Sequence, residues 1–299
     1  MSRQIELSVV TINYNGVEDT LELIYSLRKY LTVQYEIIVV DNASDNDEVS
    51  IINQMAPDCI TIANDKNIGF SGGNNIGIKK ATGRYILMLN NDTIVKDDSV
   101  QKLITFMDAN PQIGGVSPKL LYAEASPDII QYAGATELSM VTLRNKTIGQ
   151  GEIDKGQYNE SQKTSFLHGA AMMIRREAIE KAGLMPEVFF LYYEEIDWST
   201  QIEKNGFELW YNPVCSIYHK ESRSVGSESP LKIYYMTRNR LLYAWRNRLG
   251  LAKILSFIYL FGVAATRNTI KYLLRGDLDL ARSVVCGGLA FIKLKNKLN

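Results

Sequence analysis

A carboxylate at the end of an apolar run is the first feature of this chain that could support chemistry. Residues 85–93, YILMLNNDT, begin with large apolar side chains and end on Asn90, Asn91 and Asp92. This pattern is typical of a buried strand whose last residues reach a ligand site. Mg²⁺ takes one or two protein carboxylates together with phosphate oxygens, so Asp92 is a candidate metal ligand. A turn or helix cap is the alternative role.

Two other segments could hold a nucleotide. Asp41 ends the run VVD, where a nucleotide-binding sheet can present an acceptor to a base or ribose. Residues 67–77, NIGFSGGNNIG, predict a glycine-rich turn that lets the backbone approach a ligand before a helix N-terminus. The segment matches neither the dinucleotide fingerprint nor the P-loop lysine pattern, and an ordinary tight turn is the alternative.

Three acids are crowded in YYEEIDW, residues 192–198. Glu194, Glu195 and Asp197 follow a Phe- and Tyr-rich run, and acids at a helix start are also favoured by the helix dipole alone. Carboxylates that repel one another and lose solvent have raised pKa values, which suits a general base for a hydroxyl nucleophile.

The chain has only two histidines. His219 follows a strand-like run and opens a polar loop, where its imidazole could complete a metal site with Asp92. His168 precedes a small-residue turn in FLHGAA and could line an acceptor pocket. A packing role is the alternative for both.

The elements that must position these residues alternate between strands and helices. Residues 7–12 predict a strand and 17–30 a helix, and the pattern repeats with strands near 35–42, 59–65 and 84–92. Nearly all-apolar strands joined by helices predict a parallel sheet buried on both faces. The polar residues at the expected strand ends are Asn13, Asn15, Asp41, Asn42, Asn64, Asp65, Asn90, Asn91 and Asp92.

The middle of the chain is less regular. Residues 121–163 are polar and predict loops or antiparallel strands, and FLHGAAMMIRREAIEKAG then predicts a strand and a helix. A second helix with an acidic start ends at Asn205-Gly206 and precedes another strand. No linker separates the parts, so we expect them to share one core.

The C-terminal region from about Ser229 is basic and aromatic. Its run ILSFIYLFGVAA has about a dozen apolar residues, fewer than the roughly 20 that span a bilayer. Basic and aromatic residues beside an apolar helix suit a membrane interface. Packing on the main domain or on a second subunit is the alternative.

Composition excludes some functions. The 299 residues are 46% hydrophobic and 22% charged, which is typical of a globular protein. Because 33 basic residues balance 33 acidic ones, no nucleic-acid partner is expected. Cys59, Cys215 and Cys286 predict reduced thiols in a cytosolic protein. The N-terminus lacks the pattern of a signal peptide, so we expect a cytoplasmic location.

Together these segments resemble family 2 glycosyltransferases, in particular the rhamnosyltransferase-like branch. The resemblance covers about residues 5–226, and the tail KIYYMTRNRLLYAWRN also resembles that branch. The motifs that carry it, in order, are VVTINYNG, IIVVDNASDN, NIGFSGGNNIGI, LMLNNDT, GAAMMIRREAI, FLYYEEIDWSTQIEKNGF and YHKESRSVG.

The resemblance implies an α/β protein of the GT-A fold, with a mostly parallel central sheet flanked by helices. The implied glycosyltransferase domain is 1–226, with a nucleotide-sugar half (1–120) and an acceptor half (121–226). Residues 227–299 would form a helical, amphipathic C-terminal extension.

The resemblance also implies an inverting, metal-dependent sugar transfer. Asp92, in the family's Asp-x-Asp region, and His219 would bind Mg²⁺ or Mn²⁺, Glu195 would be the base, and Asp197 is the alternative base. The implied nucleotide-sugar contacts are Thr11, Asn13, Asn15, Asp41, Asn42, Asn67, Gly69, Gly72, Asn74 and Asn91. The implied acceptor contacts are His168, Gly169, Glu194 and Trp198.

The implied donor is dTDP-rhamnose, and UDP-galactofuranose, UDP-galactose and UDP-glucose are alternatives. A saccharide or lipid-linked saccharide at the inner face of the cytoplasmic membrane would be the acceptor, in the synthesis of O-antigen, capsule or another cell-wall polysaccharide. A homodimer through the C-terminal helices is a further expectation. Two rival functions are a nucleotidyltransferase and a catalytically inactive binding or assembly subunit. The nucleotidyltransferase lacks support, because the segment TINYNGVED is not a basic phosphate-binding loop.

Overall fold

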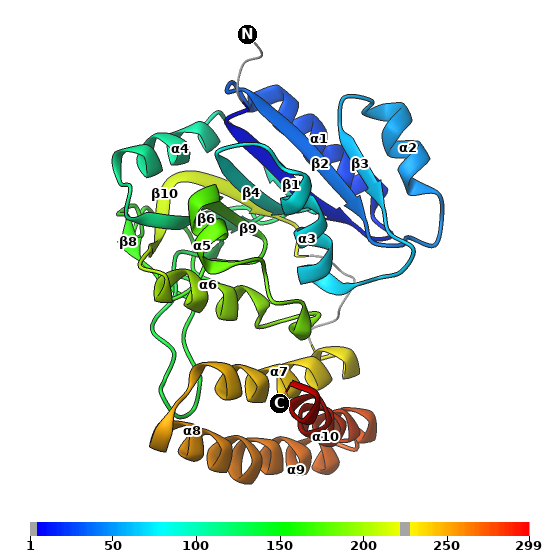
Figure 1. The fold of residues 1–299 in the computed structure, drawn as a ribbon, viewed down its shortest axis with the longest axis vertical. Helices are drawn as coiled ribbons and strands as arrows, with labels where there is room; N and C mark the ends of the chain where they lie inside the picture. The colour runs from blue at the N-terminus through cyan, green and yellow to red at the C-terminus, as the bar shows by residue number, and fades with distance from the viewer. Residues whose placement is uncertain (1–4, 222–227, 299) are drawn as a thin grey trace.

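Strands and helices alternate through the first half of the chain, as the apolar pattern predicts. The computed structural model describes residues 5–221 and 228–298 (Figure 1). The end of the motif YHKESRSVG and the expected domain boundary at residue 226 lie outside the described residues. The first elements are β1 (Leu7–Asn13), α1 (Val17–Tyr30), β2 (Tyr35–Asp41), α2 (Glu48–Met55), β3 (Ile60–Ala63), α3 (Gly69–Lys80) and β4 (Tyr85–Asn90).

The second half adds antiparallel strands to the same sheet. The strand order is β3-β2-β1-β4-β9-β6-β10-β5, with β7 beside β6 and β8 beside β10. The sheet is parallel from β3 to β4, whereas β9 is antiparallel to both β4 and β6. These elements are β5 (Thr93–Val95), α4 (Val100–Ala109), β6 (Ile113–Tyr122), β7 (Ile130–Tyr132), β8 (Gln162–Lys163), β9 (Ala171–Arg175), α5 (Arg176–Ala182), the 3₁₀ helix η1 (Glu187–Phe189), α6 (Glu194–Lys204) and β10 (Glu208–His219).

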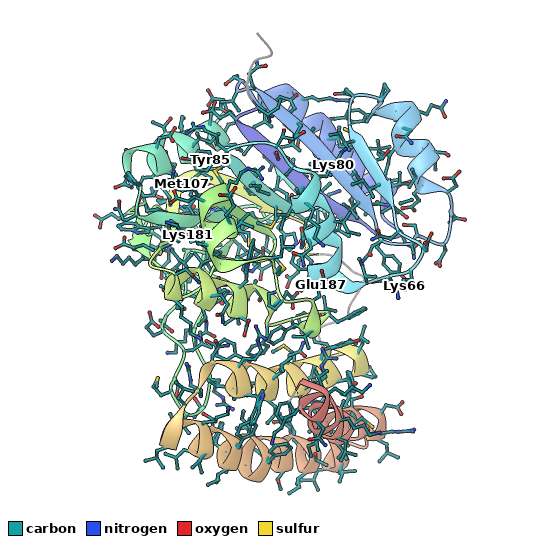
Figure 2. All side chains as sticks on the ribbon, viewed as in Figure 1. Lys66, Lys80, Tyr85, Met107, Lys181 and Glu187 are labelled. Atoms are coloured by element: carbon teal, nitrogen blue, oxygen red, sulfur yellow. The ribbon has the colours of Figure 1, made fainter. Side chains whose placement is uncertain are left out.

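The sheet is buried on both faces, because successive side chains of a strand point to opposite sides. In β1, Val9 belongs to the core that also holds side chains of α1, α2 and α4, whereas Val10 belongs to the core that holds side chains of α3, α5 and α6. Side chains from both halves of the chain fill these two layers (Figure 2). The expectation of a shared core is therefore confirmed.

Strand register aligns the polar residues at one edge of the sheet. Asn13 pairs with Asp41 across β1 and β2, and Ile12 pairs with Asn90 across β1 and β4. Antiparallel pairing of β5 with β10 sets His219 opposite Thr93, the residue after Asp92. Candidate residues from distant parts of the sequence therefore meet at the carboxyl ends of the parallel strands.

The glycine-rich segment is helical, so the predicted turn over residues 67–77 is wrong beyond Ile68. Helix α3 begins at Gly69, and its glycines allow it to lie close against β1. A Cβ on Gly73 would lie 2.9 Å from Ile12 Cδ1, and one on Gly77 would lie 2.3 Å from Val10 Cγ1. The run of glycines is explained by close packing of helix on strand.

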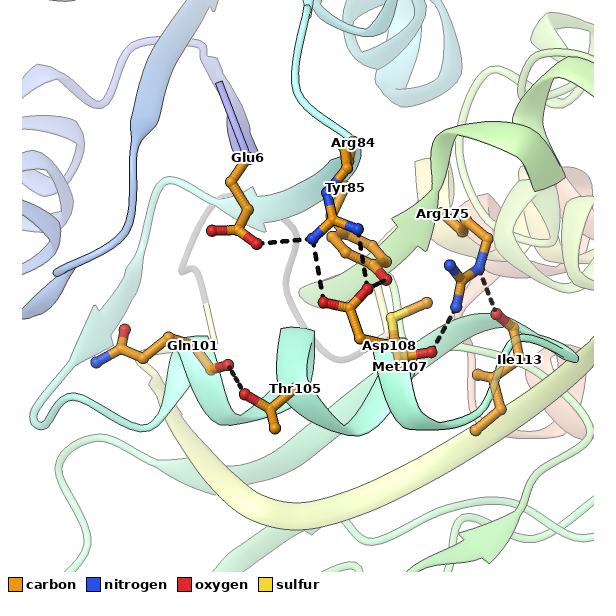
Figure 3. A network of polar contacts seen from close by, with 9 residues as sticks. All are labelled: Glu6, Arg84, Tyr85, Gln101, Thr105, Met107, Asp108, Ile113 and Arg175. Carbon is orange, nitrogen blue, oxygen red and sulfur yellow. Dashed lines mark hydrogen bonds and ion pairs between the residues drawn. The ribbon is translucent and has the colours of Figure 1, made fainter. Parts of the chain in front are cut away.

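A polar network ties the sheet to α4 at the opposite end from the candidate site (Figure 3). Arg84 donates to Glu6 and to Asp108, and the Tyr85 hydroxyl also donates to Asp108. Arg175, at the end of β9, donates to the carbonyls of Ile113 and Met107. These contacts fix the ends of β4 and β9 that lie away from the candidate site.

The C-terminal region is helical, as expected. Figure 1 shows α7 beneath α6, with α8 and α9 forming a further layer below α7. Ser229 caps the first helix by accepting from the Lys232 amide. The helices are α7 (Pro230–Asn247), α8 (Gly250–Phe257), the π-helix η2 (Ile258–Ala265), α9 (Thr266–Leu274) and α10 (Leu278–Leu298).

The expectation that the apolar run is too short to span a bilayer is wrong on length. Elements α8, η2 and α9 form one uninterrupted helix, Gly250–Leu274, of 25 residues. Only 17% of its most apolar window is buried, and by length and composition alone it could cross a membrane. The apolar run of about a dozen residues ends just before Thr266, whereas the helix continues to Leu274.

We predict that Gly77→Ala destabilises the protein, because its Cβ would overlap Val10 Cγ1. Such overpacking costs about 1–3 kcal/mol, and each kcal/mol lowers the Tm of a chain of this size by about 2–4 °C. Gly262→Ala is the matched control, because nothing lies within 4 Å of its Cβ position and alanine favours a helix. Equal melting temperatures for Gly77→Ala and wild type would contradict this account of α3.

Candidate active site

A cavity of about 300 Å³ lies at the carboxyl edge of the sheet. It brings together His168, Gly169, Glu194, Glu195 and His219, which are five of the residues expected from the sequence. Its other lining residues are Phe70, Asn90, Thr147, Phe166, Ala170, Leu191 and Tyr192. Aromatic walls around carboxylates and imidazoles are typical of a site that excludes water from reacting groups.

Asp92 and His219 form a buried pair next to this cavity. His219 Nε2 lies 3.1 Å from Asp92 Oδ1 but outside hydrogen-bonding geometry, and both side chains are nearly inaccessible. The pair forms because β5 and β10 align His219 with Thr93, and the Lys220 amide donates to the Asp92 carbonyl.

The chemistry of this pair fits a divalent cation. His219 Nδ1 lies 2.8 Å from Gln131 Oε1, and because this oxygen accepts a hydrogen bond from Nδ1–H, Nε2 keeps a free lone pair. Asp92 Oδ2 and His219 Nε2 are both buried without a hydrogen-bond partner. Within residues 5–221 and 228–298, no three His, Cys, Asp or Glu side chains converge, so this pair would need ligand oxygens to complete a coordination sphere.

Glu194 and Glu195 begin α6 at the wall of the cavity. Burial, and then repulsion from Glu195, raise the pKa of Glu194 well above its ordinary value. Burial raises the pKa of Glu195 to about 7. Glu195 is only partly covered by protein, so its carboxylate can meet a ligand and exchange a proton near neutral pH.

The turn before α6 has an unusual backbone. Phe190, Tyr192 and Tyr193 have φ values of 66°, 67° and 76°, a region that non-glycine residues rarely adopt. Residues held there cost on the order of 1 kcal/mol or more each and persist only when surrounding contacts fix them. The structure therefore fixes the direction in which Glu194 and Glu195 enter the cavity.

His168 is neutral. Burial, and then the neighbouring His219, lower the pKa of His168 to about 3. Its Nδ1 accepts from the Ala170 amide, so the proton is on Nε2 and is free to donate. This side chain can hydrogen-bond an uncharged hydroxyl in the cavity.

A second polar cluster lies at the ends of β1 and β2. The Asn13 amide group donates to Asp41 at 2.7 Å and to Glu48 at 2.6 Å, and Asn13 Oδ1 accepts from Thr20. Asp41 also accepts from the Ser44 amide and hydroxyl. Asp41 is therefore held in a fixed orientation by the protein.

Other expected nucleotide-sugar residues have internal partners. Asn42 donates to Asn67 and to the Gly69 carbonyl, and it organises the chain before α3. The remaining internal contacts are those of Asn15 with Asp45 and Ser44, Asn74 with the Phe70 carbonyl, Asn91 with Gly16 and Thr20, and Gly72 with Ile68. Thr11 differs, because it is buried in the sheet and its Oγ1 has no hydrogen-bond partner.

Two residues expected to act in catalysis or in acceptor binding lie away from the cavity. Asp197 is fully buried and is bound by Arg246 through both carboxylate oxygens and by the Asn247 amide. Trp198 packs in the core, where its indole N–H donates to the Gly183 carbonyl. Both oxygens of the Asp197 carboxylate are already engaged, and a core indole has no surface for an acceptor, so the geometry favours neither role.

Asn90, expected at the polar end of β4, lines the cavity as well. Two contributing residues had no role in the sequence interpretation. Thr147 lines the cavity from an irregular loop, and Gln131 of β7 meets His219. Their contribution depends on long-range folding, and no local pattern marks them.

Comparison with known proteins gives a consistent result. The model of glycosyl transferase family 2 matches residues 8–183. The low-salt glycan biosynthesis hexosyltransferase Agl10 of Haloferax volcanii is 27% identical over 245 residues, covering 79% of this chain and 75% of that protein. The dTDP-rhamnosyl transferase RfbF of Shigella flexneri is 24% identical over 276 residues, covering 84% and 88%.

Solved structures share the fold. The mannosyltransferase PcManGT of Pyrobaculum calidifontis, solved with GDP-Man and Mn²⁺, has a TM-score of 0.60 at 15% identity, over 97% of this chain and 88% of that chain. GalNAc-T7, solved with UDP, GalNAc and Mn²⁺, has a TM-score of 0.63 at 17% identity, over 91% and 59%. The expected GT-A fold is confirmed.

We predict that Glu195→Gln stabilises the protein above neutral pH. Because the pKa of Glu195 rises from its ordinary 4.5 to about 7 on folding, wild-type stability is retained below about pH 4.5 and is lost as pH rises to 7. The advantage of the variant in free energy of unfolding should grow by on the order of 1–3 kcal/mol between pH 5 and pH 8, and its Tm relative to wild type should rise accordingly. Thermal melts across this range measure it. Glu177→Gln on exposed α5 is the control, and a pH-independent difference for Glu195→Gln would contradict the raised pKa.

Proposed function

The chain belongs to glycosyl transferase family 2, and we propose that it transfers rhamnose from dTDP-rhamnose to a hydroxyl of a saccharide or lipid-linked saccharide, with inversion. The observation that carries the proposal is one cavity lined by Glu195, whose pKa is raised to about 7, and by His219, which pairs with the unsatisfied Asp92 beside it. The likeness to the Shigella dTDP-rhamnosyl transferase supports the donor, and UDP-galactofuranose, UDP-galactose and UDP-glucose are the alternatives.

In this proposal Glu195 is the general base. The acceptor oxygen attacks the anomeric carbon as its proton passes to the Glu195 carboxylate, and the bond between that carbon and the diphosphate breaks with its electron pair leaving on the diphosphate. A single displacement from the face opposite the leaving group inverts the anomeric centre. Glu195 is preferred over Asp197 because Arg246 and Asn247 already occupy the Asp197 carboxylate.

Other groups of the cavity would orient the reactants. His168, neutral with its Nε2–H free, would donate to an acceptor or donor hydroxyl. Asp92 and His219 would hold Mg²⁺ or Mn²⁺, which neutralises the charge of a leaving diphosphate. Asp41 and Asn13, fixed at the ends of β2 and β1, would face the nucleoside.

The experiment measures nucleotide release and sugar transfer with dTDP-rhamnose, UDP-galactofuranose, UDP-galactose, UDP-glucose and GDP-mannose, each with and without Mn²⁺. We expect release from dTDP-rhamnose that depends on Mn²⁺ or Mg²⁺. Glu195→Gln should lower kcat by about 10²- to 10⁴-fold, the usual contribution of a general base, while calorimetric binding of dTDP persists. Asp92→Asn should instead weaken metal-dependent binding of dTDP.

Each outcome of this experiment separates the rivals. Release from a UDP-sugar alone would overturn rhamnose and keep the reaction class. Nucleotide binding without turnover of any donor would favour the inactive binding subunit. Undiminished activity of Glu195→Gln, beside an inactive Asp197→Asn, would assign the base to Asp197.

We also propose that the C-terminal helices dock on an anionic lipid bilayer, where a lipid-linked acceptor would be found at the inner face of the cytoplasmic membrane. Between Arg248 and Lys297 the chain has nine Lys or Arg and two Asp, although the whole chain is neutral. Side chains project outward from α8 and α9 (Figure 2). The exposed large apolar residues of this layer include Leu249, Leu251, Ile254, Ile258, Val263, Ile270, Leu273, Leu274 and Leu278. Exposed apolar groups among cations suit an anionic interface.

We predict binding to phosphatidylglycerol vesicles that is weakened by salt and is much lower with phosphatidylcholine. The combined change Leu251→Ser, Ile254→Ser and Ile258→Ser should reduce binding at least tenfold, as measured by vesicle flotation. Ile51→Ser, at an exposed apolar position on α2, is the control. Loss of a dimer in light scattering, without any change in flotation, would assign this face to a second copy of the chain.

A further inference from the structure

Helix α7 contacts the strained turn that leads into the two glutamates. Asn239 is completely buried in α7, and its side-chain Nδ2 lies within hydrogen-bonding distance of three carbonyls. The distances are 2.9 Å to Phe189, 2.7 Å to Leu191 and 2.8 Å to Tyr192. One side-chain amide group therefore contacts three backbone oxygens of the turn, and these contacts offset the cost of its unfavourable φ values.

The neighbouring side chain strengthens this contact. Arg238 donates from Nη2 to the carbonyls of Val188 and Phe189, and from Nε to Asn239 Oδ1 at 2.7 Å. Both ends of the Asn239 carboxamide are thus engaged, which fixes its orientation. Tyr235, one turn earlier in α7, stacks on Phe190 with ring centroids 5.2 Å apart.

The turn is also held from the opposite side. The Phe70 amide donates to the Phe190 carbonyl at 2.8 Å, and a Cβ on Gly69 would lie 2.3 Å from that oxygen. The residues from 188 to 193 are therefore held between α3 and α7. Helix α6 starts directly after them, so the position of Glu195 depends on both contacts.

We propose that Asn239 is a positioning residue that directs the Glu195 carboxylate into the cavity. This inference rests on the proposed role of Glu195 as the base. Asn239 reaches that carboxylate only through the backbone of residues 189–193, and it does not touch the cavity. If the bonds from Asn239 were purely structural, their loss would lower the stability of the fold and leave the environment of the Glu195 carboxylate unchanged. A change in that environment therefore distinguishes a positioning role from a structural one.

The groups around Glu195 define the expected change. Glu194 on the same helix shares its desolvated site, and Tyr192 and Tyr193 come from the turn. His168 and His219 face the same cavity, and Arg238 from α7 acts on Glu194. If the turn relaxes, Glu195 becomes more hydrated and its pKa moves down from about 7 toward the ordinary value for glutamate.

The test is Asn239→Ala. In the variant, the midpoint of the acidic limb of kcat for nucleotide release should move at least one pH unit lower. The plateau kcat should fall at least tenfold, because the base is no longer held in place. KM for the donor should stay within about twofold, since the nucleotide contacts lie on β1 and β2. A ¹³C NMR titration of the glutamate carboxyl groups, with the Glu195 signal identified by its absence in Glu195→Gln, measures the same shift without substrate.

Asn247→Ala is the matched control, because Asn247 lies on the same helix and bonds α6 at Asp197 but does not contact the turn. It should lower Tm and leave the Glu195 midpoint in place. If Asn239→Ala does not fold, Arg238→Lys is the second variant. It keeps a positive charge near Glu194 but loses the bonds from Arg238 to the carbonyls of Val188 and Phe189. The titration of Glu195 in this variant then tests the inference in the same way. An unchanged Glu195 titration in the folded variant would overturn the inference. Full activity of Glu195→Gln would instead overturn the proposed base.

Discussion

The short antiparallel pairing of β5 with β10 is the constraint on which the candidate site depends. It sets His219 opposite Thr93 and so brings an imidazole to Asp92 from a distant part of the sequence. Gln131 then fixes the tautomer. Without this pairing, the polar end of β4 would be only a turn, and the neighbouring cavity would lose one wall.

Burial of like charges is costly, and the fold offsets this cost with contacts from outside the sheet. Glu194 and Glu195 are desolvated next to each other, after a turn with three left-handed residues. The offsetting contacts come from α7, a helix that contributes nothing to the central sheet. A strained, destabilised site supported by a rigid neighbour is a common arrangement for reactive groups.

Three features could be predicted from the sequence: the parallel half of the fold, the polar sheet edge, and the pairing of Asp92 with His219. Each of them rests on local periodicity or on a motif. The helical state of residues 69–77 could not be predicted, since glycine favours turns in isolation and only the close approach of Val10 and Ile12 explains the helix. The crowding of acids in the sequence could not show which of Glu195 and Asp197 is free to act as the base. Arg246 and Asn247, which bind Asp197, are distant from it in the sequence. The support from Asn239 is a tertiary contact with no local signature.

The order of these elements along the chain has a consequence for synthesis. Strands β1 to β4 emerge from the ribosome first and can pair locally, whereas α7 follows α6 and is made after the residues that it holds. A nascent chain that ends after β10 therefore contains every strand of the sheet but lacks the bonds from Asn239 and Arg238. The parallel half of the sheet can assemble early, and the turn before Glu195 acquires its bonds to α7 only once that helix has been translated.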